Sequence, residues 1–310
     1  MIGGMRIAVM GTGGVGGYFG ARLQHSGHDV AFVARGKQLA ALRADGLRVE
    51  SPLGDLHLPE VVATDDPAGL EPVDLVLFSV KLWDTEDAAA RIRPLLRDET
   101  AVVSFQNGVV KDDVLGRVLG ARHVLGGTAH IAATIDRPGV IRHAGTLQKL
   151  TFGEYGGARS ARVEAFRAAC ADAGIDAEVS ADIARAIWEK FVFLVGLSGT
   201  TSLARTPIGP IRANPRARAF LRDVMDEVVQ VARATGVPLP RDYADDRLAF
   251  VDGVPETMTS SMHHDLERGN RLEVPWLSGD VVDRGRTLGV ATPANRAIAD
   301  VLAVHAGGRS

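Results

Sequence analysis

The chain has 310 residues, of which 46% are hydrophobic and 24% charged, an ordinary globular composition long enough for about two domains. The formal net charge of −3 gives no electrostatic reason to expect a nucleic acid partner. The single cysteine, Cys170, excludes an internal disulfide framework and a cysteine-based zinc site. It lies in a helix-like apolar stripe, so we interpret it as a buried packing residue rather than a nucleophile.

The start of the chain lacks the basic region and long apolar stretch of a signal peptide, and it fits a start at either Met1 or Met5. The longest apolar run, residues 191–197, is far shorter than the ~18 residues that a membrane span needs. We therefore expect a cytoplasmic protein without a membrane partner, which also suits the low cysteine content.

The first half of the chain alternates short apolar runs with helix-like segments. Predicted strands cover residues 6–10, 29–34, 73–80, 100–105 and 123–128, and predicted helices cover 15–25, 85–96 and 109–119. Two further strands, near 140–143 and 148–153, are expected at the edge of the sheet. This alternation is typical of βαβ units, in which helices cover a parallel sheet.

After about Gly174 the apolar spacing becomes helical. Predicted helices cover residues 181–203, 216–235, 242–250, 257–268, 276–288 and 293–305. The predicted fold is therefore an α/β, Rossmann-type doubly wound domain over residues 1–177, followed by an all-helical domain over residues 178–310.

A glycine-rich segment, Gly11-Thr12-Gly13-Gly14-Val15-Gly16, matches G-x-G-x-x-G between the first predicted strand and helix. Such a segment binds a dinucleotide: Gly11 permits a tight turn, Gly13 lets the backbone approach a pyrophosphate, and Gly16 lets the helix pack on the strand. The helix N-terminus then attracts the anion. Alternatively, the segment is a plain strand-to-helix turn.

The end of the second predicted strand selects the cofactor. NAD enzymes usually carry a carboxylate there, whereas this chain has Arg35 and Lys37. An arginine can make paired hydrogen bonds with a 2′-phosphate, so the sequence predicts NADP(H). The alternative is a solvated pair of surface cations.

Several motifs, taken in chain order, resemble those of ketopantoate reductases: the glycine segment, Arg35, Ser79-Val80-Lys81, Gln106-Asn107-Gly108, Trp188-Glu189-Lys190, Ser260-Ser261-Met262 and Glu273. The resemblance covers nearly the whole chain. It implies a two-domain enzyme with its active site in the cleft between the domains. It also implies NADPH-dependent reduction of 2-dehydropantoate to pantoate, a step towards pantothenate, so that a small 2-keto acid is the expected partner. The sequence also allows a homodimer.

The resemblance also implies roles for individual residues. Lys190 matches the catalytic lysine, Glu273 a carboxylate that contacts the substrate, and Ser261 a substrate-binding serine. Asn107 matches the asparagine beside the cofactor and substrate, and Lys81 a lysine near the nicotinamide. An ammonium suits this chemistry, because it can stabilise the charge that develops on a carbonyl oxygen and then deliver the proton.

Each of these residues also has a structural interpretation. The stem of Lys190 would lie along apolar surface while its head reaches water. Glu273 and Ser261 would belong to helix starts, Asn107 to a turn, and Lys81 to a strand end.

One departure from the family pattern concerns the lysine-bearing helix. Many members carry asparagines one and two turns after the lysine, where this chain has Leu194 and Ser198. Ser198 remains a predicted substrate contact, whereas Leu194 cannot hydrogen-bond. The substrate could therefore be another 2-keto acid, and a non-catalytic NADP-binding redox sensor is a further alternative. The histidines show no metal-ligand spacing, and we expect no metal.

Overall fold

The computed structural model describes residues 4–309, so the choice between Met1 and Met5 as the start lies outside the described residues. The chain divides into two compact units. The sheet unit comprises the residues up to Asn107 together with Lys111–Ala186, and the helical unit comprises Gly108–Val110 and the residues from Ile187 onward.

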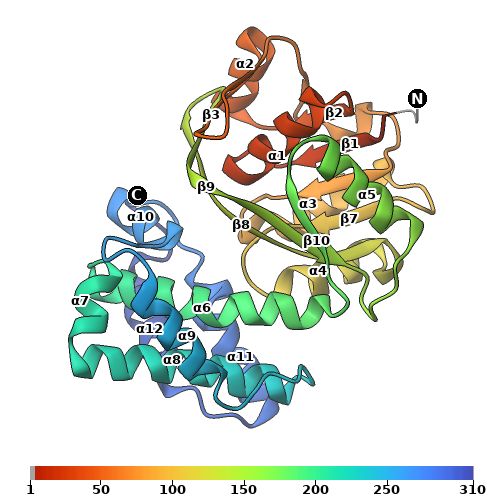
Figure 1. Ribbon diagram of the computed structural model, residues 1–310. Helices are drawn as coiled ribbons and strands as arrows, with labels where there is room; N and C mark the ends of the chain where they lie inside the picture. The colour runs from red at the N-terminus through yellow and green to blue at the C-terminus, as the bar shows by residue number, and fades with distance from the viewer. Residues whose placement is uncertain (1–3, 310) are drawn as a thin grey trace. The chain divides into compact units, whose positions relative to one another are not determined.

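The sheet unit contains one mixed sheet (Figure 1). Its strands are β1 (Arg6–Met10), β2 (Asp29–Val33), β3 (Leu47–Glu50), β4 (Leu56–Leu58), β5 (Val62–Thr64), β6 (Leu75–Phe78), β7 (Ala101–Ser104), β8 (Val124–Arg137), β9 (Val140–Gly153) and β10 (Asp176–Val179). They follow the order β4-β3-β9-β8-β7-β6-β1-β2-β5, with β10 paired to β9. The strands from β7 to β5 pair in parallel, as do β7 and β8, so the predicted Rossmann-type fold is confirmed.

Helices cover both faces of this sheet because apolar residues of its central strands alternate between two cores. The helices are α1 (Gly14–His25), α2 (Gly36–Asp45), α3 (Thr85–Arg91), α4 (Val110–Leu119) and α5 (Ala161–Asp172), with 3-10 turns η1 (Pro67–Gly69), η2 (Leu82–Asp84), η3 (Arg93–Leu95) and η4 (Ala121–His123). Along β1, Ile7 and Val9 enter one core, and Ala8 and Met10 the other. Cys170 of α5 is fully buried in the first core, which confirms its packing role, and burial raises the pKa of its thiol.

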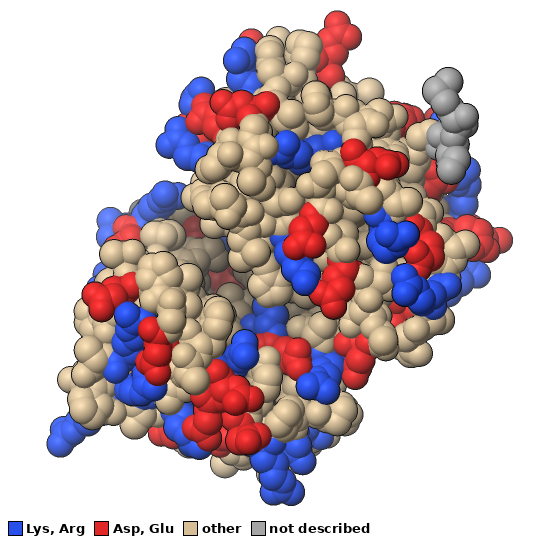
Figure 2. All heavy atoms as spheres, viewed as in Figure 1, with Lys and Arg blue, Asp and Glu red and all other residues tan. Residues whose placement is uncertain are grey.

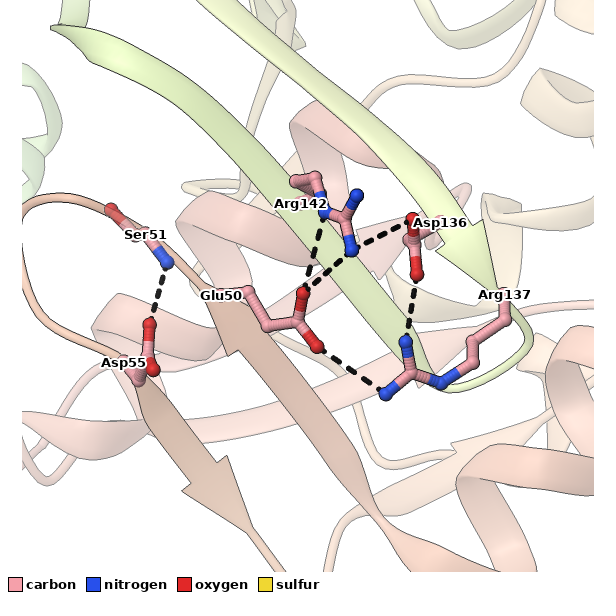
Figure 3. A network of polar contacts seen from close by, with 6 residues as sticks. All are labelled: Glu50, Ser51, Asp55, Asp136, Arg137 and Arg142. Atoms are coloured by element: carbon pink, nitrogen blue, oxygen red, sulfur yellow. Dashed lines mark hydrogen bonds and ion pairs between the residues drawn. The ribbon is translucent and has the colours of Figure 1, made fainter.

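The long hairpin of β8 and β9 corrects one expectation. The two edge strands expected near 140–143 and 148–153 are a single strand, β9, inside the sheet between β3 and β8. Register shifts against β8 interrupt its regular alternation, which is why the sequence pattern splits it in two. At the hairpin tip, Glu50 of β3 accepts hydrogen bonds from Arg137 and Arg142, which also pair with Asp136 (Figure 3).

The boundary between the units lies between Ala186 and Ile187, inside helix α6 (Ile183–Ala204). The boundary predicted from the sequence lies earlier, after residue 177. The difference arises because β10, a strand that the sequence pattern did not predict, pairs in parallel with β9. That strand and the first turn of α6 therefore stay with the sheet unit.

The helical unit contains only helices and turns among its described residues, as predicted. After α6 come α7 (Ile208–Ala213), α8 (Pro215–Ala234), α9 (Tyr243–Gly253), α10 (Ser261–Arg268), η5 (Val274–Trp276), α11 (Ser278–Leu288), α12 (Pro293–Leu302) and η6 (Ala303–His305). Buried Glu227 of α8 accepts hydrogen bonds from the backbone amides of Ala294 and Asn295, at 2.7 and 2.8 Å, and so caps α12.

The surface carries both signs of charge. On the face shown in Figure 2, Lys and Arg side chains are interspersed with Asp and Glu. Among residues 4–309, no helix combines the length and apolar character that crossing a bilayer requires.

Candidate functional site

The glycine loop, residues Gly11 to Gly16, connects β1 to α1. The backbone amides of Gly11 and Thr12 both donate to the carbonyl oxygen of Val33 at 3.2 Å, and the Thr12 hydroxyl donates to the same oxygen at 3.1 Å. Gly11 has a φ of +99°, a conformation that favours glycine. These contacts fix the loop against the end of β2 and give the start of α1 a defined position.

The surroundings of the loop leave one side open. No atom lies within 4 Å of the point where a Cβ on Gly13 would stand, whereas a Cβ on Gly14 would lie 2.1 Å from the carbonyl oxygen of Ala133 in β8. A Cβ on Gly16 would lie 2.3 Å from the Gly11 oxygen. The N-terminus of α1 has no side-chain cap and no acidic residue in its first turn. The residues present therefore fit a pyrophosphate approaching at Gly13.

Gln38 of α2 ties the loop to the β8–β9 hairpin. Its side-chain amide donates to the carbonyl oxygen of Thr12 at 3.2 Å and accepts from the backbone amide of Gly139, in the hairpin turn, at 3.0 Å. Gln38 is not among the predicted site residues, because the sequence pattern does not predict α2. Its only sequence signal is a glutamine a few residues after the second strand, which is not specific.

Arg35 occupies the N-cap position of α2, directly after β2. Its side chain is 67% exposed, and Nη2 lies 2.7 Å from Oδ2 of Asp84 at the end of η2. Lys37, two residues further on, is also exposed. Arg35, the residue predicted to bind the 2′-phosphate, thus has a carboxylate partner, Asp84, which was not among the predicted site residues.

Lys81 is the exposed residue that precedes η2. Its ammonium lies 5.6 Å from the ring centroid of Trp83, within the range of a cation–π interaction. The indole thus lies against the lysine head at the end of β6.

Asn107 is half-buried after the end of β7, and the buried side chain of Gln106 organises the backbone beside it. Gln106 accepts a hydrogen bond from the Ser104 hydroxyl at 3.0 Å, and its amide donates to the Val80 carbonyl at 2.9 Å and the Thr85 hydroxyl at 2.8 Å. Gln106 belongs to the Gln106-Asn107-Gly108 motif, but no role was predicted for it. It links the ends of β6 and β7.

The predicted cofactor-binding residues share one edge of the sheet. The glycine loop, Arg35, Lys81 and Asn107 follow β1, β2, β6 and β7, four adjacent parallel strands in the order β7-β6-β1-β2. Since parallel strands end at the same edge, the structure brings all four elements together there. Open α/β sheets bind ligands at this edge, where the strand order reverses.

Lys190 is half-buried in α6, within the helical unit. Ile187 and Phe191, one turn before it and next to it, are buried, and the Trp188 ring packs edge-on against Phe191 at 5.6 Å between centroids. The helix therefore places this lysine at the border of an apolar core.

Ser198 lies two turns further along α6 and is only 1% exposed. Its hydroxyl donates to the carbonyl oxygen of Leu194 at 2.6 Å, and Thr200 and Thr201 make the same type of bond to carbonyls four residues earlier. The hydroxyl that was predicted to contact substrate is thus bonded to its own helix.

Ser261 is the exposed first residue of α10. The helix cap is provided by Ser260, whose hydroxyl accepts from the backbone amide of His263 at 3.1 Å. A helix-capping role for Ser261, the structural alternative, is therefore already taken by its neighbour. The His263 ring nitrogen Nδ1 lies 2.9 Å from the Thr201 carbonyl oxygen, which joins α10 to α6.

Glu273 is 7% exposed, and its carboxylate does not cap the short turn η5 that follows. The helix predicted over residues 276–288 begins only at Ser278, after this turn. A Cβ on Gly199 of α6 would lie 3.5 Å from the Ser278 hydroxyl, so the start of α11 packs closely on α6. The elements that flank Glu273 and carry Ser261 are thus both joined to the lysine-bearing helix.

Metal-ligating side chains do not gather in the described part of the chain: no group of three or more His, Cys, Asp or Glu in residues 4–309 could hold a metal ion.

Family models match both units. The model described as "Ketopantoate reductase PanE/ApbA" matches residues 7–157, and the model of its C-terminal domain matches residues 182–306. A 2-dehydropantoate 2-reductase of Halobacterium salinarum is 36% identical over 303 residues, covering 96% of this chain and 98% of that protein. One from Archaeoglobus fulgidus is 36% identical over 301 residues, covering 96% of each chain.

Solved structures agree with these matches. A PanE/ApbA family ketopantoate reductase from Ralstonia eutropha has a TM-score of 0.89 at 34% identity, covering 97% of this chain and 98% of that one. D-mandelate dehydrogenase, solved with NADH and anilino(oxo)acetate, has a TM-score of 0.88 at 20% identity, which shows a shared fold. The chain therefore belongs to the ketopantoate reductase family and is an oxidoreductase that acts on a CH–OH or C=O group.

Proposed function

We propose that this protein is a cytoplasmic enzyme that reduces 2-dehydropantoate to (R)-pantoate with NADPH, a step towards pantothenate. The observation that carries the proposal is the carboxyl edge of the sheet, where the uncapped start of α1, the open backbone at Gly13 and the cation of Arg35 follow adjacent strands. The substrate comes from the names of relatives that align over almost the whole chain.

In this proposal the glycine loop and the first turn of α1 hold the cofactor pyrophosphate, and Arg35 binds the 2′-phosphate. Lys81 and Asn107 lie beside the nicotinamide half. When bound, the reduced nicotinamide supplies a hydride to the carbonyl carbon of the 2-keto acid.

Lys190 acts as the general acid. Its ammonium stabilises the negative charge that develops on the carbonyl oxygen and donates the proton that completes the 2-hydroxy acid. Glu273 accepts a hydrogen bond from a substrate hydroxyl or holds the ammonium, and Ser261 positions the substrate. The apolar residues around Lys190 support this role, because they favour a neutral amine after proton transfer.

The test is NADPH oxidation by the purified protein over a panel of 2-keto acids, with Lys190→Ala as the variant. We expect 2-dehydropantoate to give the highest kcat/KM and the variant to lose ~10²-fold or more in kcat, as on removal of a general acid. Lys149→Ala, which removes a lysine paired with Glu178 on β9 and β10, is the control and should retain activity. A kcat that survives Lys190→Ala would show that another group is the acid.

Reduction of a different 2-keto acid is the second candidate. The observation that favours it lies on α6, where Leu194 has no polar group and the Ser198 hydroxyl bonds to the Leu194 carbonyl. Contacts that asparagines would make to a pantoyl group are thus absent from this turn. A higher kcat/KM for a 2-keto acid without the pantoyl hydroxyl would establish this alternative.

A further inference from the structure

The ion pair between Arg35 and Asp84 crosses the end of the central strand. Arg35 follows β2 and Asp84 lies shortly after β6, and these strands flank β1 on opposite sides. The pair therefore extends above the carboxyl end of β1, from which the glycine loop emerges. A Rossmann domain binds the adenosine part of its cofactor in this region.

Asp84 pairs with Arg35 instead of making the hydrogen bond that an N-cap aspartate usually makes to its own helix. It is the N-cap residue of α3, where an aspartate normally accepts a hydrogen bond from the helix backbone, yet its side chain makes no such bond. Its Oδ2 instead lies 2.7 Å from Nη2 of Arg35, 49 residues earlier in the chain. The carboxylate thus points towards the cofactor edge and not towards its own helix.

Arg35 and Asp84 differ in how exposed their side chains are and in how firmly their surroundings hold them. The Arg35 side chain is 67% exposed and Asp84 28%. The segment that bears Asp84 is held by Gln106, which donates to the Val80 carbonyl and the Thr85 hydroxyl, while that hydroxyl donates to the Leu82 carbonyl at 2.8 Å. Arg35 can exchange partners, whereas the segment that bears the Asp84 carboxylate is held in place.

We infer that Asp84 is a specificity-determining residue that competes with the cofactor's 2′-phosphate for Arg35 and thereby limits the preference for NADPH over NADH. The inference rests on the proposed use of NADPH. To bind a 2′-phosphate, Arg35 must give up a charge-assisted hydrogen bond, and the fixed carboxylate remains near a second anion. A ligand without the 2′-phosphate binds without breaking the Arg35–Asp84 hydrogen bond and without placing a phosphate near the Asp84 carboxylate.

The experiment measures binding, so that it does not depend on the substrate. Isothermal titration calorimetry gives the Kd of adenosine 2′,5′-bisphosphate and of adenosine 5′-monophosphate, two fragments that differ only in the 2′-phosphate. The proteins are the wild type, Asp84→Asn, Asp84→Ala, Arg35→Ala, and Arg35→Ala combined with Asp84→Asn. Glu86→Gln is the matched control, because Glu86 is two residues away and pairs with Arg117 on the surface.

Removal of the carboxylate should raise the preference for the bisphosphate about tenfold, equivalent to ~1.4 kcal/mol. Glu86→Gln should leave the ratio of the two Kd values unchanged, and the effect of Asp84→Asn should be smaller when Arg35 is alanine, because only the repulsion between the carboxylate and the 2′-phosphate then remains. An unchanged ratio in both Asp84 variants, or an equal rise without Arg35, would overturn the inference. A wild type that prefers the monophosphate would overturn the proposed NADPH preference alone, whatever Asp84 does.

Discussion

Gly13 and Gly14 are adjacent, but their surroundings differ, and so do their structural roles. Open space faces Gly13, whereas the backbone of β8 at Ala133 occupies the position of a Gly14 side chain. The motif predicted glycines for cofactor approach and for helix packing. It did not indicate a contact with a hairpin more than a hundred residues later, because a sequence motif carries no information on which distant strand packs against it.

Substitution of each glycine by alanine should distinguish the role of Gly13 in cofactor binding from the role of Gly14 in packing. Gly13→Ala has room for its methyl group and a φ of −86°, so we expect an unchanged melting temperature and weaker cofactor binding. Gly14→Ala should lose ~1–3 kcal/mol of unfolding free energy, because the methyl group would displace β8. Urea denaturation and cofactor titration measure the two effects. Equal stability of the two variants would contradict the assignment.

Lys111 and Asp112 show where residue type misleads. Both look like solvated residues in the first turn of α4, yet they are 1% and 7% exposed. The Lys111 ammonium lies 2.8 Å from Oδ2 of Asp112, which also accepts from the Tyr155 hydroxyl at 2.7 Å. Burial raises the pKa of Asp112, and the Lys111 ammonium opposes that rise. Sequence alone could not predict this pair, because the packing of the segment around Tyr155 creates it.

Asp112→Ala should therefore be strongly destabilising. It leaves the buried Lys111 ammonium without a counter-charge, for which we expect a loss of ~3–5 kcal/mol of unfolding free energy. Asp98→Ala, which breaks an exposed pair with Arg122, should cost ~1 kcal/mol or less. Chemical denaturation of both variants is the measurement, and similar losses would show that burial of the first pair is unimportant.

Secondary-structure elements were predictable where their pattern was regular. The central strands and long helices matched, because apolar spacing alone defines them. The short strands β3, β4 and β5 and helix α2 escaped prediction, since few apolar residues mark them. Gln38 was not predicted as part of the candidate site, because it lies on the unpredicted helix α2. The site residues at the ends of strongly apolar strands were identified.

The junction between β9 and α5 should respond to acid. Arg162 of α5 donates to both carboxylate oxygens of Glu154, at 2.7 and 2.8 Å, and Ser160 donates to Oε1 at 2.6 Å. Chiefly through the hydrogen bonds from Arg162, the pKa of Glu154 lies below its usual value of 4.5. A lowered pKa in the folded state means that the stabilisation is present above pH 4.5 and is lost as the pH falls through the folded-state value.

Glu154→Gln should accordingly be less stable than the wild type at neutral pH, and the difference should shrink below about pH 4.5. Urea denaturation at a series of pH values from neutral to acid measures it. Glu71→Gln is the control, since Glu71 is an exposed glutamate outside this junction. A stability difference that does not depend on pH would refute a contribution from ionised Glu154.

For the complete chain, cofactor binding should appear as thermal stability. A ligand that binds only the folded state at about 100 times its Kd adds ~2.7 kcal/mol of unfolding free energy. We therefore expect NADPH to raise the melting temperature of the sheet unit in proportion to the logarithm of its concentration. Arg35→Ala should reduce the shift at equal concentration. Differential scanning calorimetry tests this, and a melting temperature insensitive to NADPH would contradict dinucleotide binding.

The strand order has a consequence for self-association. Its two outer strands, β4 and β5, have three residues each, and β10, paired on one side to β9, has four. An added strand would find only a few free amides and carbonyls on these borders, too few for a stable intermolecular ladder. The longest strands, β8 and β9, pair with each other along most of their length, and β7, β3 and β10 cover parts of their other flanks. Growth of the sheet from one molecule to the next is thus disfavoured at its short outer strands.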